Sequence, residues 1–213
     1  MSRTLSPPSR GRAALAAAVL GLLSLTGCSS GEDSNEAGGS SEGSETKRLS
    51  AVGVSFEVPA GWQELDAEEV ADGAGKSPKI GELADQMGLT AEQFEQTMAS
   101  VDLMVVSDEG ARAGFLDNVT VLGAPGQLPN DEQLKLQFLQ IGADVRDISH
   151  EQTDLGDTTV LVYELDAADI HVEGEAVFVE TGKSAVSLTV SATERDTTDE
   201  IAEGILDSLA EAS

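Results

Sequence analysis

Hydrophobic and polar residues alternate through most of the second half of the chain, with the period of two that a half-buried β-strand produces. The alternation is clearest near the C-terminus, where Val186, Leu188 and Val190 are separated by serine and threonine. Strands are predicted at residues 145–154, 158–165, 171–181 and 184–194. Turn residues at Gly156–Asp157 and Thr181–Lys183 connect neighbouring strands closely enough for hairpins. These four strands are therefore expected to form an antiparallel meander.

The first half of the chain contains three more segments with the pattern of strands. They cover residues 52–58, which alternate, the apolar run 101–106, and residues 115–122, which return from it. Pro59 and Gly61 end the first of these strands and aim Trp62 back across its end. Trp62 is the only tryptophan, and a core position is a simpler interpretation than a ligand platform.

Elsewhere the apolar spacing changes to that of amphipathic helices. A short helix is expected at 64–72, and a helical hairpin follows at 80–98, with a stop at Gly88 and a capping box at Thr90 and Gln93. Phe94 and Met98 share one face of this hairpin, where they either pack in the core or line a lipid pocket, and core packing is the simpler alternative.

Two helices are predicted after these. The first begins at Asn130 or Asp131, carries Leu134, Phe138 and Ile141 on one face, and ends at Gly142. The second is opened by a capping box at Thr197 and Glu200, and its stripe of Ile201, Ile205 and Leu209 is expected to cover the sheet.

The N-terminal 27 residues have the three parts of a secretory signal: three arginines, an apolar stretch over residues 13–25, and small residues before Cys28. The stretch is too short to span a membrane. Leu25-Thr26-Gly27-Cys28 resembles the lipobox of bacterial lipoproteins, and this resemblance implies cleavage between Gly27 and Cys28 and a diacylglyceryl thioether on Cys28. We interpret residues 1–27 as the signal peptide, 28–49 as the lipidated cysteine with a flexible Ser/Gly/acidic tether, and 50–213 as a single domain.

The signal carries three of the 12 basic residues and none of the 39 acidic ones, so the mature chain has nine basic and 39 acidic residues and a formal charge of −30. This charge excludes nucleic acid as a partner and disfavours electrostatic binding to anionic lipids. The covalent lipid on Cys28 is then the main membrane contact, on the outer face of the cytoplasmic membrane.

Candidate chemistry is sparse, and we expect neither an enzyme nor a cofactor. Only His150 and His171 are available to a Ser/His/acid mechanism, and no Gly-x-Ser-x-Gly motif is present. Alternation places His171, Glu173 and Glu175 on one face of a strand, where they form either a divalent-cation site or a solvated sheet edge. The solvated edge is the simpler interpretation in a chain so rich in acids, as is a surface position for His150.

The loop at 109–114 contains Arg112, one of the nine basic residues of the mature chain. Loops on a rigid scaffold often carry binding residues, so Arg112 is a candidate for partner binding, although an ordinary hairpin tip is the simpler alternative.

The run Phe56-Glu57-Val58-Pro59-Ala60-Gly61-Trp62, the segment at 115–119 and the closing helix together resemble the PsbP-like fold, and specifically the LpqN/LpqT-type lipoproteins of Gram-positive envelopes. The resemblance implies an α+β fold with an antiparallel sheet flanked by helices on both faces. It also implies a docking or accessory role beside an envelope or transport protein. A carrier or chaperone that holds a lipid or another apolar ligand between sheet and helices is the alternative.

Overall fold

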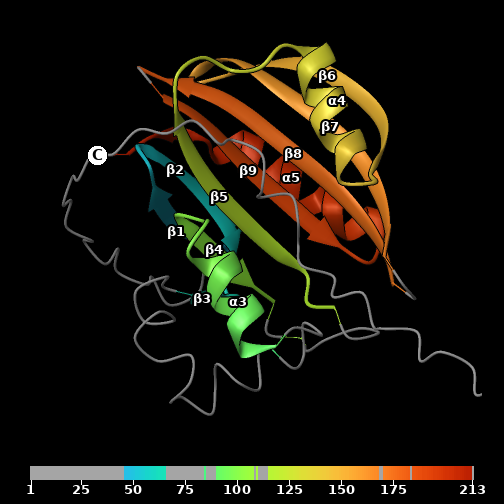
Figure 1. Ribbon diagram of the computed structural model, residues 1–213. Coiled ribbons are helices and arrows are strands. Elements are labelled where there is room, and N and C mark those ends of the chain that lie inside the picture. Colours follow the sequence, from blue (N-terminus) through green and yellow to red (C-terminus); the bar gives the residue numbers. More distant parts are fainter. Residues whose placement is uncertain are drawn as a thin grey trace, which may run out of the picture.

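The computed structural model describes residues 46–65, 84, 90–107, 109, 115–167, 170–182 and 184–212. Its centre is an antiparallel sheet of seven strands in the order β3-β4-β5-β9-β8-β7-β6 (Figure 1). The strands are β3 (Gln63–Leu65), β4 (Leu103–Val106), β5 (Asn118–Pro125), β6 (Asp144–Thr153), β7 (Gly156–Ala167), β8 (Ile170–Thr181) and β9 (Ser184–Ala192). The last four reproduce the predicted meander closely.

A second sheet of three strands, in the order β1-β2-β10, consists of β1 (Thr46–Ala51), β2 (Val54–Pro59) and β10 (Ala210–Glu211). The strand expected at 52–58 is confirmed for residues 54–58, which lie in β2, but its first two residues, Val52 and Gly53, form the turn of the β1–β2 hairpin. Both have positive φ, 46° and 86°, which is unusual for a β-branched valine. Val52 also packs against Gly123 of β5, where a Cβ atom would lie only 2.9 Å from Val52. This packing offsets the backbone strain of the turn.

The boundary that we drew between tether and domain also changes. Residues 46–49, assigned to the tether, belong to β1, and Leu49 is buried in the core. The charged and hydroxyl side chains around Leu49 concealed this strand, because their outward-facing positions resemble the Ser/Gly/acidic segment before them.

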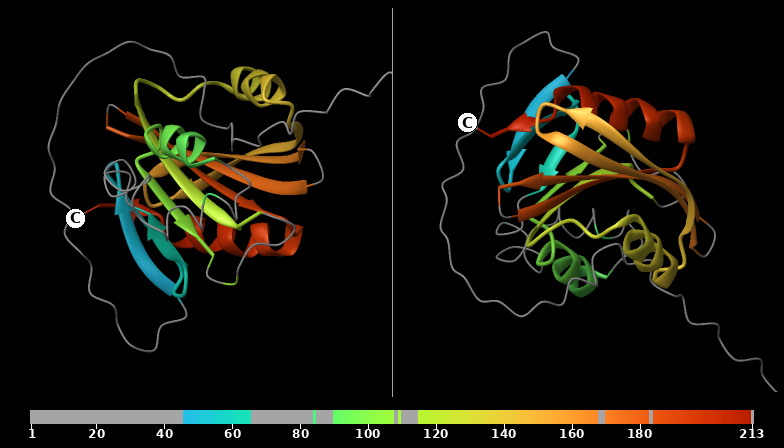
Figure 2. Two further views of the ribbon diagram at one scale, coloured as in Figure 1. Left: turned by 60° about the horizontal axis from the view of Figure 1, so that its bottom comes forward. Right: turned by 90° about the horizontal axis from the view of Figure 1, so that it is seen from above.

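Helices cover both faces of the seven-stranded sheet, as expected for the α+β sandwich (Figure 2). Helix α5 (Arg195–Ser208) lies on one face together with the β1–β2 hairpin, and α3 (Ala91–Met98) and α4 (Asp131–Gln140) lie on the other. We call these the α5 face and the α3/α4 face. No helix within the described ranges is both long and apolar enough to cross a membrane.

The α5 face holds one continuous apolar core. It combines side chains of β2, the sheet and α5, including Phe56, Leu188 and Ile205, and it contains Trp62, which confirms the predicted core position. The α3/α4 face has two separate apolar clusters instead. Phe94 and Met98 of α3 pack on β4, which confirms their core role, while Leu134 and Phe138 of α4 pack on β7 and β8.

Helix α4 begins and ends where the sequence indicates. The Asn130 side chain accepts a hydrogen bond from Gln133 N, and Gln133 Oε1 accepts one from Asn130 N, which makes a capping box. At the other end, Gly142 has a φ of 85° and donates to Leu139 O.

Several other boundaries differ from those predicted. Strand β4 begins at Leu103 rather than at residue 101. Helix α5 begins at Arg195 rather than at Thr197, and Glu194 precedes it without a side-chain cap. The β6–β7 turn lies at Asp154–Leu155 rather than at Gly156–Asp157. The return strand β5 begins at Asn118, three residues after the predicted start.

The prediction of a helix at 64–72 is wrong for its first two residues, because Glu64 and Leu65 are in β3. Residues 66–72 lie outside the described residues, as does most of the first helix of the predicted hairpin, of which only Ala84 is described, as helical.

Candidate functional site

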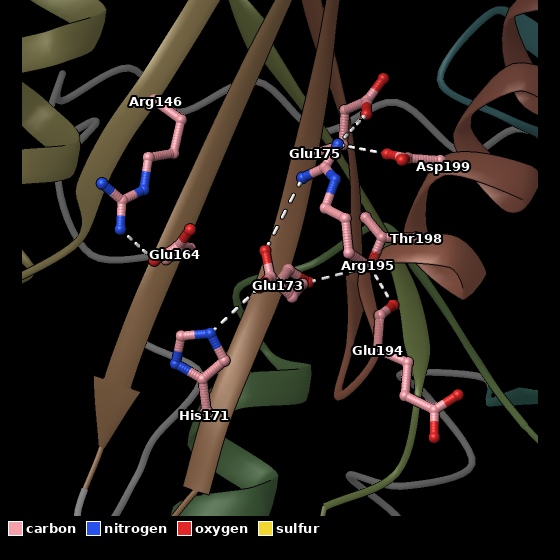
Figure 3. A network of polar contacts seen from close by, with 9 residues as sticks. All are labelled: Arg146, Glu164, His171, Glu173, Glu175, Glu194, Arg195, Thr198 and Asp199. Carbon is pink, nitrogen blue, oxygen red and sulfur yellow. Dashed lines mark hydrogen bonds and ion pairs between the residues drawn. The ribbon is translucent and has the colours of Figure 1, made fainter.

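His171, Glu173 and Glu175 share one face of β8, as alternation predicts. Val177 and Val179 continue the same register into the core of the α5 face. The three polar side chains therefore extend that core toward the end of the sheet where α5 begins (Figure 3).

His171 is held by carboxylates on both ring nitrogens. Its Nδ1 lies 2.6 Å from Asp166 Oδ1, on the cross-strand partner residue in β7, and its Nε2 lies 3.0 Å from Glu173 Oε1. The hydrogen bonds to Asp166 and then Glu173 raise the pKa of His171 above its ordinary value. The imidazole thus serves as a bridge between two acidic side chains.

Arg195, the first residue of α5, contacts three carboxylates. Its Nη2 donates to Glu175 Oε2 at 3.0 Å and also to Asp199 Oδ1, one turn further along the helix. Its Nη1 is buried without a hydrogen-bond partner and lies 3.9 Å from Glu173 Oε2. The guanidinium therefore attaches the start of α5 to β8 (Figure 3).

Glu175 is 8% exposed, and its burial raises the pKa of its carboxyl from 4.5 to about 7, with Arg195 opposing the rise. Burial disfavours the charged carboxylate, and the nearby guanidinium compensates only in part. Beside this network, Arg146 of β6 pairs with Glu164 of β7.

The solvated-edge interpretation is wrong for Glu173 and Glu175, which are largely buried. The metal-site alternative finds no support in the geometry, because the guanidinium of Arg195 already lies beside both glutamates and both imidazole nitrogens are engaged. Among the residues that the structure describes, no group of three or more His, Cys, Asp or Glu could hold a metal ion. The alternation of the sequence correctly places His171, Glu173 and Glu175 on one face of a strand. Their partner Arg195 belongs to α5, and no sequence pattern near these three residues predicts its contacts with Glu173 and Glu175.

His150 lies on the α3/α4 face, and it is exposed, as predicted. Its Nε2 is 3.3 Å from Asp131 Oδ2 at the start of α4, and its Nδ1 is 3.2 Å from Thr159 Oγ1 on the neighbouring strand. It links the edge strand β6 to α4.

The outer side of α4 is apolar at two positions. Leu136 and Leu139, three residues apart, are 57% and 53% exposed, and they are the large hydrophobic side chains of the described ranges that face solvent. Leu134 and Phe138 hold the other side of α4 on the sheet. The apolar spacing of α4 predicts only its buried stripe, so the sequence pattern does not single out these two leucines.

The sheet between the two clusters of the α3/α4 face is lined with small polar residues. Asn118 lies opposite Ser191, and Thr120 lies opposite Thr189, on the paired strands β5 and β9. All four are buried. We call these four residues the polar floor.

Tyr163 closes one side of the polar floor. Its ring lies over Gly174, where a Cβ atom would be only 2.1 Å from the ring, and its hydroxyl is 3.2 Å from Ser191 Oγ. Burial raises the pKa of Tyr163 to about 12, so this hydroxyl stays protonated. Phe138 of α4 packs against the ring with centroids 4.9 Å apart.

Three of the predicted site residues lie outside the described residues. These are Gly27 and Cys28 of the cleavage and lipidation site, and Arg112 of the 109–114 loop.

The sequence matches no known family profile, and no curated protein is significantly similar to it. Solved structures with a similar fold exist. The solution structure of cyanobacterial PsbP (CyanoP) from Synechocystis sp. PCC 6803 has a TM-score of 0.52 at 14% identity, with 82% of this chain and 98% of CyanoP covered. LpqN of Mycobacterium tuberculosis, described as involved in cell envelope biogenesis, has a TM-score of 0.45 at 11% identity, with 81% and 88% covered. The likeness to CyanoP confirms the PsbP-like fold.

Proposed function

We propose that this chain is an extracytoplasmic lipoprotein, anchored by lipid on Cys28, whose domain acts as a non-enzymatic accessory module by binding another envelope protein. The observation that carries the proposal is the exposed pair Leu136 and Leu139 on α4. Full burial of a leucine contributes about 1.5–3 kcal/mol, so covering the exposed half of each side chain favours a partner by about 1 kcal/mol or more.

A rigid scaffold supports this surface. Leu134 and Phe138 fix α4 to the sheet, and caps define both of its ends. The two leucines therefore need little ordering when a partner covers them, which lowers the entropic cost of binding.

The charge of the chain favours a protein partner with basic residues. The first turn of α4 carries Asp131 and Glu132, and the mature chain has a formal charge of −30 if cleavage occurs before Cys28. Anionic lipid head groups and a second copy of this chain are both repelled by such a charge. A partner with basic residues would be attracted by the negative charge, and an apolar pocket on it would cover the two exposed leucines.

The contacts of His171 support a non-enzymatic role. Its two ring nitrogens lie 2.6 Å from Asp166 Oδ1 and 3.0 Å from Glu173 Oε1, so both are engaged by carboxylates. A general base needs a nitrogen that can take the proton of a nucleophile, so this imidazole would first have to leave one of its two partners.

The proposed anchor leaves α4 accessible. Cys28 precedes β1 by 18 residues, which can span at most about 60 Å when fully extended. The chain enters the domain through β1, on the sheet face opposite α4 (Figure 2). A partner can therefore reach the leucines without displacing the β1–β2 hairpin.

A photoreactive amino acid placed at position 136 or 139 in the full-length chain tests this surface in cells of the native host. We expect a crosslinked protein from both positions. Position 203 is the matched control, since Glu203 is exposed on α5, on the opposite sheet face. Equal adducts at 203, or none at 136 and 139 at equal expression, would contradict the proposed docking surface.

The anchor has its own test. Cys28→Ala should leave uncut precursor that incorporates no labelled fatty acid, because the sulfur that accepts the lipid is gone. Unchanged labelling of the variant would rule out Cys28 as the anchor.

A further inference from the structure

The polar floor on the α3/α4 face has no role in the docking surface on α4. Its residues form two rows across the sheet, Asn118 opposite Ser191 and Thr120 opposite Thr189. Each row continues on β4 with an apolar residue, Val106 beside Asn118 and Met104 beside Thr120. On the far side, Gly174 and Ala176 of β8 pair with Ser191 and Thr189, so small residues border the rows.

The two threonines carry hydroxyls without partners. Thr189 is 4% and Thr120 is 7% exposed, and neither hydroxyl has a hydrogen-bond partner within the described part of the chain. Leaving a buried hydroxyl without a hydrogen bond is unfavourable, and native proteins rarely do so.

These hydroxyls nevertheless keep some accessible surface. Of the side-chain polar atoms in the described ranges, Arg195 Nη1 is the one that is both fully buried and without a partner. The remaining exposure of Thr120 and Thr189 therefore includes their hydroxyl oxygens, and a group approaching from the α3/α4 face can reach them.

Other polar groups of the floor surround this pair. The Asn118 Nδ2 donates to Leu116 O at 2.9 Å, so the side-chain oxygen of Asn118 remains as an acceptor. Ser191 shares its hydroxyl with Tyr163, whose ring is seated over Gly174. The floor thus offers hydroxyl donors and acceptors and an amide oxygen, and no charged side chain.

We propose that the polar floor binds a neutral, hydroxyl-rich ligand of the sugar class, with Thr120 and Thr189 as its central contacts. A sugar ring presents hydroxyls that pair with these side chains. A carboxylate or phosphate would find no cationic side chain among the four residues of the floor, and an acyl chain would leave both threonine hydroxyls unpaired.

Threonine-methyl NMR of the full-length lipidated chain, in a detergent without a sugar head group, tests this site. Glucose, N-acetylglucosamine and glycerol are the neutral probes, and sodium decanoate is the apolar one. At least one sugar should shift the Thr120 and Thr189 methyl signals with saturation, at a half-saturating concentration of about 1 mM, the weak end of specific binding. Cosedimentation with purified cell-wall glycan then tells whether a polymer-borne sugar binds better than the free one.

Thr120→Val and Thr189→Val remove one hydroxyl each while keeping the branched shape. Each should weaken sugar binding by about tenfold, the effect of one hydrogen bond, without lowering the unfolding midpoint. Thr197→Val, on α5 across the sheet, is the matched control and should bind as the wild type does. Shifts that never saturate, affinities equal in all three variants, or saturation by decanoate alone would each overturn the proposal. Because these readouts do not involve Leu136 or Leu139, their failure leaves the docking surface untouched.

Discussion

The two faces of the seven-stranded sheet are built differently. In the described ranges the α5 face buries 18 hydrophobic residues in one cluster, while the α3/α4 face buries eight under α3 and seven under α4, as separate groups. The polar floor lies between those two groups. The contrast indicates that the described part of the α5 face forms one continuous core, and that the α3/α4 face tolerates polar and exposed positions available for binding.

The largest effect is expected in the α5-face core. Trp62→Ala should lower the free energy of unfolding by about 3–5 kcal/mol, because it removes a large buried side chain and leaves a cavity. Denaturant unfolding of the full-length chain measures the change. A midpoint equal to that of the wild type would contradict the core position of Trp62.

A smaller loss is expected on the α3/α4 face from Gly174→Ala. The added Cβ would lie 2.1 Å from the Tyr163 ring, which would have to move off the sheet and lose its hydrogen bond to Ser191. Overpacking of this kind costs about 1–3 kcal/mol. Tyr163→Phe is the control, since it keeps the ring and removes only the hydrogen bond, at about 1 kcal/mol. A Gly174→Ala protein as stable as the wild type would show that the ring has room to move.

The sequence predicts the elements of both faces better than their junctions. The strands β6 to β9 follow from alternation, because one side of each strand faces an apolar layer. The β1–β2 hairpin does not follow, because valine is a poor residue for a turn with positive φ and only its packing against Gly123 makes Val52 suitable. Strand β10 is two residues long and gives no periodic signal at all.

The start of α5 shows the same limit. Thr197 and Glu200 have the spacing of a capping box, yet the helix begins earlier, at Arg195, whose guanidinium pairs with Glu175 of β8. Thr198 also donates to Glu173 O, a backbone atom of that strand. Contacts between distant elements outweigh the local signal here. Such contacts also determine the environment of His171, Glu173 and Glu175, which pair with Arg195 and Asp166 of other elements.

The charged end of the α5 face gives a pH-dependent test. The folded pKa of Glu175 is about 7, above its ordinary value of 4.5, so between these pH values the folded protein binds a proton that the unfolded chain has lost. Stability therefore falls as pH rises through this window, by at most about 1.4 kcal/mol per pH unit from this group. His171 acts in the same direction above pH 6.5, because its pKa is also raised.

Glu175→Gln isolates this contribution, since it removes the titrating group and keeps a similar shape. The variant should lose stability less steeply than the wild type between pH 4.5 and 7, as measured by denaturant unfolding at several pH values. The other charged groups acting on Glu175 are Arg195, Asp199 and Glu151, and all of them remain in the variant. Parallel pH profiles for the two proteins would show that Glu175 is ionised alike in both states.

The smallest effect is expected on the outer side of α4, and it separates binding from folding on the α3/α4 face. Leu139→Ser changes a side chain that is 53% exposed, so the free energy of unfolding should change by no more than about 0.5 kcal/mol. Leu134→Ala, five residues earlier on the buried side of the same helix, should cost about 2–5 kcal/mol and serves as the matched comparison. If α4 is a docking surface, Leu139→Ser should also reduce partner recovery from host cells at equal expression. A loss of stability comparable to that of Leu134→Ala would place Leu139 in the core, and the contrast between the two sides of α4 would no longer hold.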